Sequence, residues 1–355
     1  MPSVTFSPDE KVKIACALDE AGVHVIEAGF PPVSKAEKEA VSTIAAAGLR
    51  AEIEVIARTM KSDIDAAIDC GVNTVALFIG TSPYHLQYKL QISFQEAVKR
   101  ACDAVEYAKE RGIQVIFAAE DATRTETSSL LEIYRRVEEA GADILAFPDT
   151  VGIMYPARMR ELVRCIVNQV GVPLTVHCHN DLGLAVANTL AGVEGGAMGV
   201  QCSVNGLGER SGNAALDEVV IGLNKFFGFD LDINTDKFFE LSRLVSELSG
   251  IPLHSNKPLV GDNAFACESG VHALGVMRAP QCYEPFQPEL VGNKRHFFFG
   301  KHSGKNIVAE TLESHEIDIN KEILQKILEI LKRSNISLDQ NQLIALAKEV
   351  KENVK

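Results

Sequence analysis

Residues 114–150 read QVIFAAEDATRTETSSLLEIYRRVEEAGADILAFPDT, and this stretch contains the pattern that decides the fold. Two short apolar runs, Gln114–Glu120 and Ile144–Thr150, flank a longer amphipathic segment that ends near Gly141. A short apolar run predicts a buried strand, and a glycine just past an amphipathic segment predicts the end of a helix. The stretch therefore predicts a strand, a helix and a second strand parallel to the first.

The same unit recurs between residue 8 and about residue 230. The other predicted strands are Val23–Gly29, Glu52–Ala57, Thr74–Gly80, Leu174–Asn180 and Gly199–Asn205. Open doubly wound sheets usually have about five or six strands, and a closed (β/α)8 barrel has eight. The chain opens with a helix signal, because Ser7 is a suitable N-cap and Glu10 completes a capping box. In a barrel that helix follows the first strand, so we predict an α/β fold, a TIM (β/α)8 barrel missing its first strand. A seven-stranded or otherwise closed sheet is the rarer alternative.

The pattern changes after about residue 230. The stretch Ile251–Lys305 is punctuated by Gly, Pro and Asn and has few strand signals, which predicts a linker with binding loops. Residues 318–353 return to helical periodicity and predict two antiparallel helices. We therefore predict a barrel catalytic domain over residues 1–232, a linker subdomain over 233–310 and a C-terminal helical segment over 311–355.

Composition narrows the class of function. The formal net charge of −13 argues against nucleic acid or an anionic membrane as the main partner, since both select for basic surfaces. The N-terminus has no apolar leader, and the chain contains no uninterrupted 18-residue apolar run. The 8 cysteines form no C-x-x-C pair, which argues against a zinc ribbon or a thioredoxin-like motif. We expect reduced thiols and a cytoplasmic location.

Polar residues end the predicted strands, where barrel enzymes build their sites. His177 and His179 lie two positions apart on one strand, so both side chains face one side and suit a divalent metal. Two ligands are too few for a site, and the pair could simply hydrogen-bond to loops. Asn213, in the loop after the next strand, could complete the ligand set or cap the following helix.

Four more strands end in functional groups, and one further candidate lies beyond the barrel. Glu27, Glu120 and Thr150 lie at the ends of their predicted strands, and Arg58 directly follows its strand. Carboxylates at such positions serve as general bases, or they order other residues of the site by hydrogen bonds. His272 lies between glycines outside the barrel, where it is either a lid residue or a structural group.

Seven strings carry a family resemblance, and they occur in one order along the chain: IEAGFP, EDATR, PDTVG, HCHNDLGLAVAN, VNGLGERSGNAAL, NAFACESGVH and GKHSG. They resemble the homocitrate, 2-isopropylmalate and citramalate synthases, the acyl-transferring branch of a metal-dependent TIM-barrel superfamily. The resemblance covers the chain from Val4 to about residue 310. It implies a Claisen-type condensation of acetyl-CoA with a 2-oxo acid, in a homodimer, with a divalent metal (Mg, Mn or Zn).

The resemblance also implies roles for individual residues. His177, His179 and Asn213 match the metal ligands of the family. Glu120 matches an active-site glutamate, and Thr150 matches the threonine that contacts the 2-oxo acid. Arg58 and Glu27 are further substrate-binding candidates because of their places at strand ends, not because of a family match. His272 matches a histidine that the family places over the partner subunit's site as a catalytic acid or base.

The sequence departs from the family pattern in three places. Family members open with a first strand ending in a D-x-x-x-RDGEQ string, which supplies a metal-binding Asp and a catalytic Arg, and that string is absent here. We expect either that Met1 is an internal residue of a longer product or that the chain is a non-catalytic paralogue. Cys267 replaces the usual His of the AFAHESG string, and Leu274 replaces a frequent Asp.

The identity of the 2-oxo acid depends on less specific features. The compact C-terminal end and the NGLGER string resemble homocitrate synthases, which makes 2-oxoglutarate the best-supported substrate. However, the string SPYHLQYKL lacks an Arg that some homocitrate synthases place there for the distal carboxylate. Isopropylmalate and citramalate synthases stay as alternatives. A cation in the pocket near Tyr84–Lys89 or at Arg58 would favour a dicarboxylic acid.

Overall fold

The computed structural model of the protein describes residues 1, 3–333, 335 and 337–353. The chain divides into two compact units, Met1–Pro252 and Leu253–Lys355. The finer division with boundaries at residues 232 and 310 stays a prediction.

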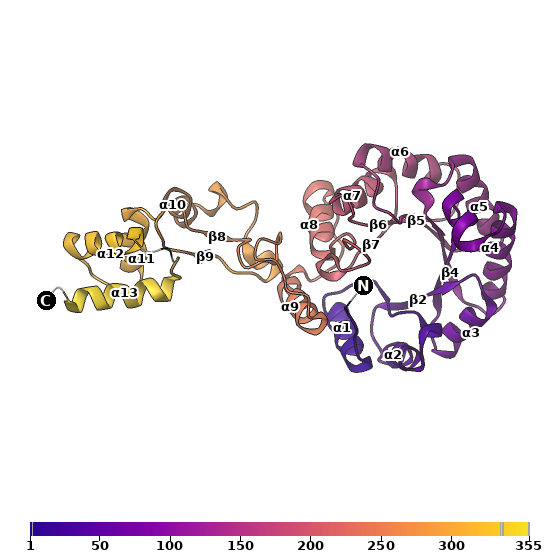
Figure 1. Ribbon diagram of the computed structural model, residues 1–355, viewed down its shortest axis with the longest axis horizontal. Coiled ribbons are helices and arrows are strands. Elements are labelled where there is room, and N and C mark those ends of the chain that lie inside the picture. The colour runs from indigo at the N-terminus through magenta and orange to yellow at the C-terminus, as the bar shows by residue number, and fades with distance from the viewer. Residues whose placement is uncertain (2, 334, 336, 354–355) are drawn as a thin grey trace. The chain divides into compact units, whose positions relative to one another are not determined.

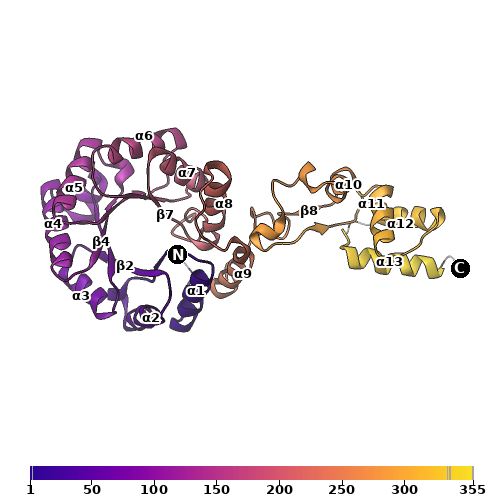
Figure 2. The ribbon, with the colours of Figure 1, turned by 180° about the vertical axis from the view of Figure 1, so that it is seen from behind.

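The first unit contains a sheet of seven parallel strands that are paired in sequence order. They are β1 (Val25–Glu27), β2 (Glu52–Arg58), β3 (Thr74–Gly80), β4 (Gln114–Glu120), β5 (Ile144–Asp149), β6 (Leu174–Cys178) and β7 (Gly199–Gln201). Figures 1 and 2 show this sheet curling around a common axis with helices on its outer side. The helices are α1 (Pro8–Glu20), α2 (Lys35–Ala45), α3 (Lys61–Asp69), α4 (Phe94–Lys109), α5 (Thr127–Glu139), α6 (Pro156–Val167), α7 (Ala185–Gly195), α8 (Leu216–Phe227) and α9 (Phe238–Ser249).

This architecture confirms the predicted fold class. Within the described residues β1 pairs only with β2, and β7 pairs only with β6, so the sheet has two edges. The predicted strands 23–29 and 199–205 are too long, because each edge strand has one neighbour and its ladder covers three residues. After β7 the chain turns at once, with Asn205 in the left-handed region at φ 59°.

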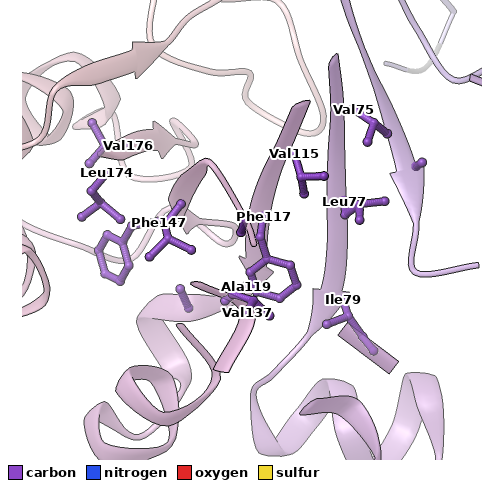
Figure 3. Packing of buried hydrophobic residues seen from close by; sticks show 14 of the residues in the cluster. Val75, Leu77, Ile79, Val115, Phe117, Ala119, Val137, Phe147, Leu174 and Val176 are labelled. Carbon is purple, nitrogen blue, oxygen red and sulfur yellow. The ribbon is translucent and has the colours of Figure 1, made fainter. Parts of the chain in front are cut away.

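Alternation along the strands separates two layers of core. The outward residues pack beneath the helices, and Figure 3 shows Val75, Leu77 and Ile79 of β3 beside Val115, Phe117 and Ala119 of β4. The inward residues form a smaller cluster around Ala76, Ile116 and Ala146. Because side chains point alternately to the two faces of a strand, each run of apolar residues fills both layers. The polar side chains that end the strands are thereby held at the carboxyl edge of the sheet.

The first helix begins as its capping signal predicts. The Ser7 hydroxyl accepts a hydrogen bond from the Glu10 amide at 3.3 Å, and the Glu10 carboxylate accepts one from the Ser7 amide at 2.7 Å. Two amide donors at the helix start are thereby satisfied. Leu241 and Val245 of α9 form a small apolar cluster with Ala21, which follows α1.

The second unit is mainly helical. It contains α10 (Gly270–Arg278), α11 (Lys305–Ser314), α12 (Lys321–Arg333) and α13 (Gln340–Asn353), with the short parallel strands β8 (Ala266–Cys267) and β9 (His296–Phe297). Helices α12 and α13 match the two expected near the end of the chain. The expectation of a loop around His272 is wrong, because this residue lies in α10, whose apolar Ala273 and Val276 are buried. None of the helices in the described residues is long and apolar enough to cross a membrane.

Candidate functional site

The two histidines that end β6 face one another. Their Nε2 atoms are 3.2 Å apart, and the ring centroids are 4.9 Å apart. Burial lowers the pKa of His177 to about 4, with a further contribution from His179. Burial also lowers the pKa of His179, and the charge of Arg210 acts in the same direction. Both rings are therefore neutral near pH 7, which is the form of imidazole that binds a metal.

Asn213 lies against this pair. Its backbone forms a β-bridge with His179, and its Oδ1 is buried without a hydrogen-bond partner, as is Nδ1 of His179. Gly208 permits this arrangement, because a Cβ there would lie 2.7 Å from the Asn213 side-chain nitrogen. A buried amide oxygen without a partner is rare in a folded protein and points to a missing ligand.

These donors fit a divalent cation. Two nitrogens bound to one ion at about 2.1 Å lie about 3.0–3.4 Å apart for tetrahedral or octahedral angles, and the observed separation of 3.2 Å falls within that range. Two imidazoles and one amide oxygen suit zinc or manganese. In the part of the chain that the structure describes, no cluster of three or more His, Cys, Asp and Glu residues has metal-binding geometry. Asn213 is therefore essential to the proposed set.

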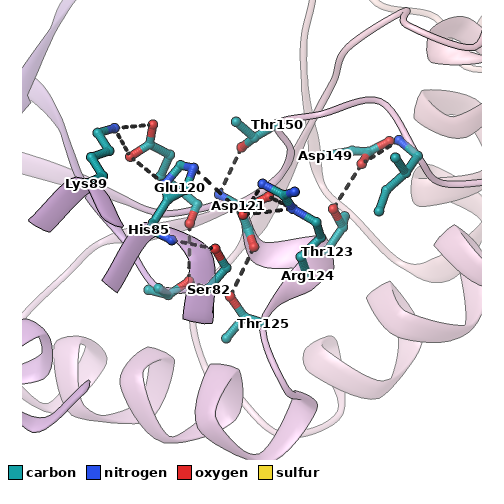
Figure 4. Close-up of polar contacts among 12 residues, drawn as sticks. Ser82, His85, Lys89, Glu120, Asp121, Thr123, Arg124, Thr125, Asp149 and Thr150 are labelled. Atoms are coloured by element: carbon teal, nitrogen blue, oxygen red, sulfur yellow. Dashed lines mark hydrogen bonds and ion pairs between the residues drawn. The ribbon is translucent and has the colours of Figure 1, made fainter. Parts of the chain in front are cut away.

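A charged network surrounds Glu120 at the end of β4 (Figure 4). Nζ of Lys89 is 2.7 Å from both Glu120 carboxylate oxygens, and Nδ1 of His85 is 3.4 Å from Oε2. Lys89 and His85 belong to one turn of π-helix, residues His85–Leu90, which follows β3. Gly80 makes room for it, since a Cβ there would lie 2.6 Å from Cβ of His85. Lys89 lies in the segment Tyr84–Lys89, where a cation was expected to favour a dicarboxylic acid, and its side chain is 48% exposed.

Asp121 ties this network to the neighbouring loop. It is fully buried and has φ of 64°, and its carboxylate receives Nε of Arg124 at 2.8 Å. Its amide donates to the Thr150 hydroxyl at 2.9 Å, so the predicted substrate-binding threonine is held beside β4 (Figure 4). A non-glycine residue in the left-handed region is strained, and such strain gathers at functional sites. Fully buried Asp149 orders the next loop by accepting from the amides of Ile153 and Met154.

The remaining candidates, Glu27 on β1 and Arg58 on β2, lie in different environments. Arg58 is bound by two hydrogen bonds to the carboxylate of Asp63, which is 2% exposed, so its charge is already balanced. Glu27 is accessible to solvent, yet the surrounding strands raise the pKa of its carboxyl by desolvation, and Lys11 only partly opposes this. The structure reveals a further residue, Glu54, whose buried Oε2 has no hydrogen-bond partner. Burial and the charges of Glu27 and another nearby carboxylate raise the pKa of Glu54 to about 8.

The last predicted catalytic residue lies in the second unit. The His272 side chain is exposed on α10, and its ring stacks on Tyr283 at a centroid distance of 4.3 Å. Sequence patterns pointed to the segment Tyr84–Lys89 but not to the contact of Lys89 with Glu120, because that contact depends on the conformation of the segment after β3. Glu54 was not expected to be a site residue, because it lies in the middle of a predicted strand, where the sequence does not indicate one.

Comparison with known proteins places the chain in a family. Residues 1–245 match the family model described as HMGL-like. The chain belongs to the HMGL-like family. Residues 259–337 of this HMGL-like chain match a second model, described as homocitrate synthase post-HMGL domain-like. These matches confirm the family resemblance drawn from the motifs.

Curated relatives have three different names. The chain is 52% identical over 322 residues to 2-isopropylmalate synthase of Methanocaldococcus jannaschii, covering 91% of this chain and 62% of the relative. It is 49% identical to homocitrate synthase AksA of Methanopyrus kandleri, covering 93% and 83%. It is 45% identical to (R)-citramalate synthase CimA of M. jannaschii, covering 93% and 67%. The chain thus spans less than two thirds of the length of the first of these.

Solved structures agree with the barrel fold. The hydroxymethylglutaryl-CoA lyase of Pseudomonas aeruginosa superposes with a TM-score of 0.61 at 21% identity, covering 69% of this chain and 87% of that one. The HMG-CoA lyase of Bacillus subtilis gives a TM-score of 0.64 at 19% identity, covering 71% and 90%. At such identities the likeness shows the fold alone.

Proposed function

We propose that this HMGL-like chain takes part in a metal-dependent condensation of acetyl-CoA with a 2-oxo acid, which releases CoA. One observation carries the proposal: the unpartnered Oδ1 of Asn213 and two neutral histidines lie at the same edge of the sheet as Glu120 and Thr150. The synthase names of the relatives support the same chemistry.

In this proposal His177, His179 and Asn213 hold the divalent cation. When bound, the cation supplies Lewis acidity at the keto group of the oxo acid. Thr150 and Arg58 position the acid, with Glu27 at the neighbouring strand end. The carbon–carbon bond forms between the acetyl methyl carbon and the keto carbon, and water then cleaves the thioester. We assign the required proton transfers to Glu120 and to His272, the latter acting across a homodimer in the cytoplasm.

We propose 2-oxoglutarate as the oxo acid, which makes the product homocitrate. Lys89 supports a dicarboxylic substrate, because its half-exposed ammonium lies beside Glu120 at the carboxyl edge of the sheet. The ammonium has three donors and is only half buried, so a second carboxylate of the substrate would bind it alongside Glu120, whereas a branched apolar chain would desolvate the Lys89–Glu120 pair at a cost. The 52% identity to a 2-isopropylmalate synthase keeps 2-oxoisovalerate as the second candidate.

The test is thiol release from acetyl-CoA with Mg²⁺ or Mn²⁺ and a panel of 2-oxoglutarate, 2-oxoisovalerate and pyruvate. We expect release that depends on 2-oxoglutarate, and a Lys89→Met variant that raises KM for this acid about tenfold without raising KM for pyruvate. A Glu120→Gln variant should lose turnover, while Glu132→Gln, on the exposed face of α5, should keep it.

The same panel is run on a fusion that places the first barrel strand of M. kandleri AksA before Met1. The absence of oxo-acid-dependent release from both proteins would leave a non-catalytic paralogue as the better account.

A further inference from the structure

Arg210 connects three loops at the carboxyl edge of the sheet. Its Nε and Nη2 atoms donate to the two carboxylate oxygens of Asp181 at 2.7 and 2.8 Å, and Nη2 also donates to the Thr150 carbonyl at 2.7 Å. Asp181 follows β6, Thr150 follows β5, and Arg210 itself follows β7. One side chain therefore joins the ends of three adjacent strands.

The turn that carries Arg210 has an unusual backbone conformation, which holds this side chain close to the loop after β6. Arg210 has φ of 54°, in the left-handed region that non-glycine residues rarely adopt. Gly212 has φ of 90°, and a Cβ there would lie 2.0 Å from the Gly206 carbonyl oxygen. The Gly212 carbonyl accepts from the amide of Asn180, which follows β6. The turn is thus held against the histidine loop by its own backbone, and the guanidinium adds the side-chain contacts.

The neighbouring loop is packed just as closely against Asp181. Gly152, with φ of 62°, would place a Cβ 2.6 Å from Oδ2 of Asp181 and 2.8 Å from its amide. Asp181 is thus enclosed by the loop after β5 on one side and by Arg210 on the other. Because Asp181 lies two residues after His179, a displacement of Asp181 would move that imidazole.

We propose that Arg210 is a positioning residue, whose bidentate contact with Asp181 and bond to the Thr150 carbonyl hold His179 and Asn213 in metal-binding register. This inference rests on the metal site of the proposed function. Guanidinium suits the task because its planar donors engage a carboxylate and a carbonyl together, which a lysine ammonium does not reproduce. Residues that orient metal ligands in this way commonly change metal affinity by about 10–100-fold when they are replaced.

The experiment measures Mn²⁺ binding to the full chain by the electron paramagnetic resonance signal of free Mn²⁺, without any organic substrate. The variants are Arg210→Gln, Arg210→Lys and the control Arg160→Gln. Arg160 donates to Glu194 at 2.8 Å between α6 and α7, and its side chain is 39% exposed, compared with 44% for Arg210. Similar exposure predicts similarly small effects on thermal stability.

We expect Arg210→Gln to weaken Mn²⁺ binding by about 10–100-fold, Arg210→Lys to weaken it less, and Arg160→Gln to leave it unchanged. Equal Mn²⁺ affinity in Arg210→Gln and Arg160→Gln would overturn the proposal. The imidazole NMR signals of His177 and His179 give a readout without metal. If the unaltered chain binds no Mn²⁺, the proposed function loses its metal site, while signals that shift only in Arg210→Gln would still support the positioning role. Signals that do not shift would reject it.

Discussion

Replacing Glu54 by Gln should change how the stability of the barrel unit depends on pH. Glu54 is 6% exposed, its Oε2 has no hydrogen-bond partner, and its pKa is raised to about 8 by burial and by nearby carboxylates. The folded state therefore holds this proton more tightly than the unfolded state does. The favourable contribution is complete below about pH 4.5 and is lost as the pH rises towards 8. Glutamine has nearly the same shape and carries no charge at any pH.

The magnitude follows from the shift. A pKa that moves from 4.5 to about 8 corresponds to about 5 kcal/mol between the acidic and basic limits. For a unit of 150–250 residues, each kcal/mol changes the unfolding temperature by about 2–4 °C. About 4 kcal/mol of this change falls between pH 5 and pH 9, so the unfolding temperature of Glu54→Gln, relative to the unaltered chain, should rise by roughly 8–16 °C over that range.

The assay is differential scanning calorimetry at several pH values between 5 and 9. The transition of the second unit serves as an internal reference, because residue 54 lies in Met1–Pro252. Glu132→Gln, an exposed position on α5, is the matched control and should show no pH-dependent gain. A constant difference in unfolding temperature between Glu54→Gln and the unaltered chain, at every pH, would refute the reasoning.

Three further predictions concern single contacts. Gly208→Ala should weaken Mn²⁺ binding at least about tenfold, because the new methyl group would lie 2.7 Å from the Asn213 side-chain nitrogen. In the control Gly304→Ala the methyl group meets nothing within 4 Å, so Mn²⁺ affinity should not change. Equal loss of affinity in both variants would contradict this. Tyr134→Phe removes a buried 2.7 Å hydrogen bond to a β5 carbonyl and should cost about 1–2 kcal/mol of unfolding free energy, measured by urea denaturation; no loss would mean that the carbonyl finds another donor. Ser7→Ala removes the capping hydroxyl of α1 and should cost about 1 kcal/mol in the same assay, and Ser7→Asp, which restores an acceptor, should recover most of it.

Local physical chemistry determined the order and type of the barrel elements from the sequence. Apolar runs and glycine stops located all seven strands, since buried parallel strands need continuous apolar residues whatever surrounds them. The capping box at Ser7 was confirmed in detail, because its contacts span three residues. Strand ends also indicated where polar groups would gather, since parallel strands share one carboxyl edge.

Tertiary structure decided which of those groups meet. Lys89 reaches Glu120 from the turn after a different strand, and Arg210 joins loops 29 and 60 residues away along the chain. Sequence patterns carry no signal for such contacts, because they depend on strand register and loop conformation. The lengths of β1 and β7, the helix around His272 and the raised pKa of Glu54 were likewise set by neighbours distant in sequence. Burial and electrostatic fields arise only from the packed arrangement, whereas periodicity and capping act between residues a few positions apart.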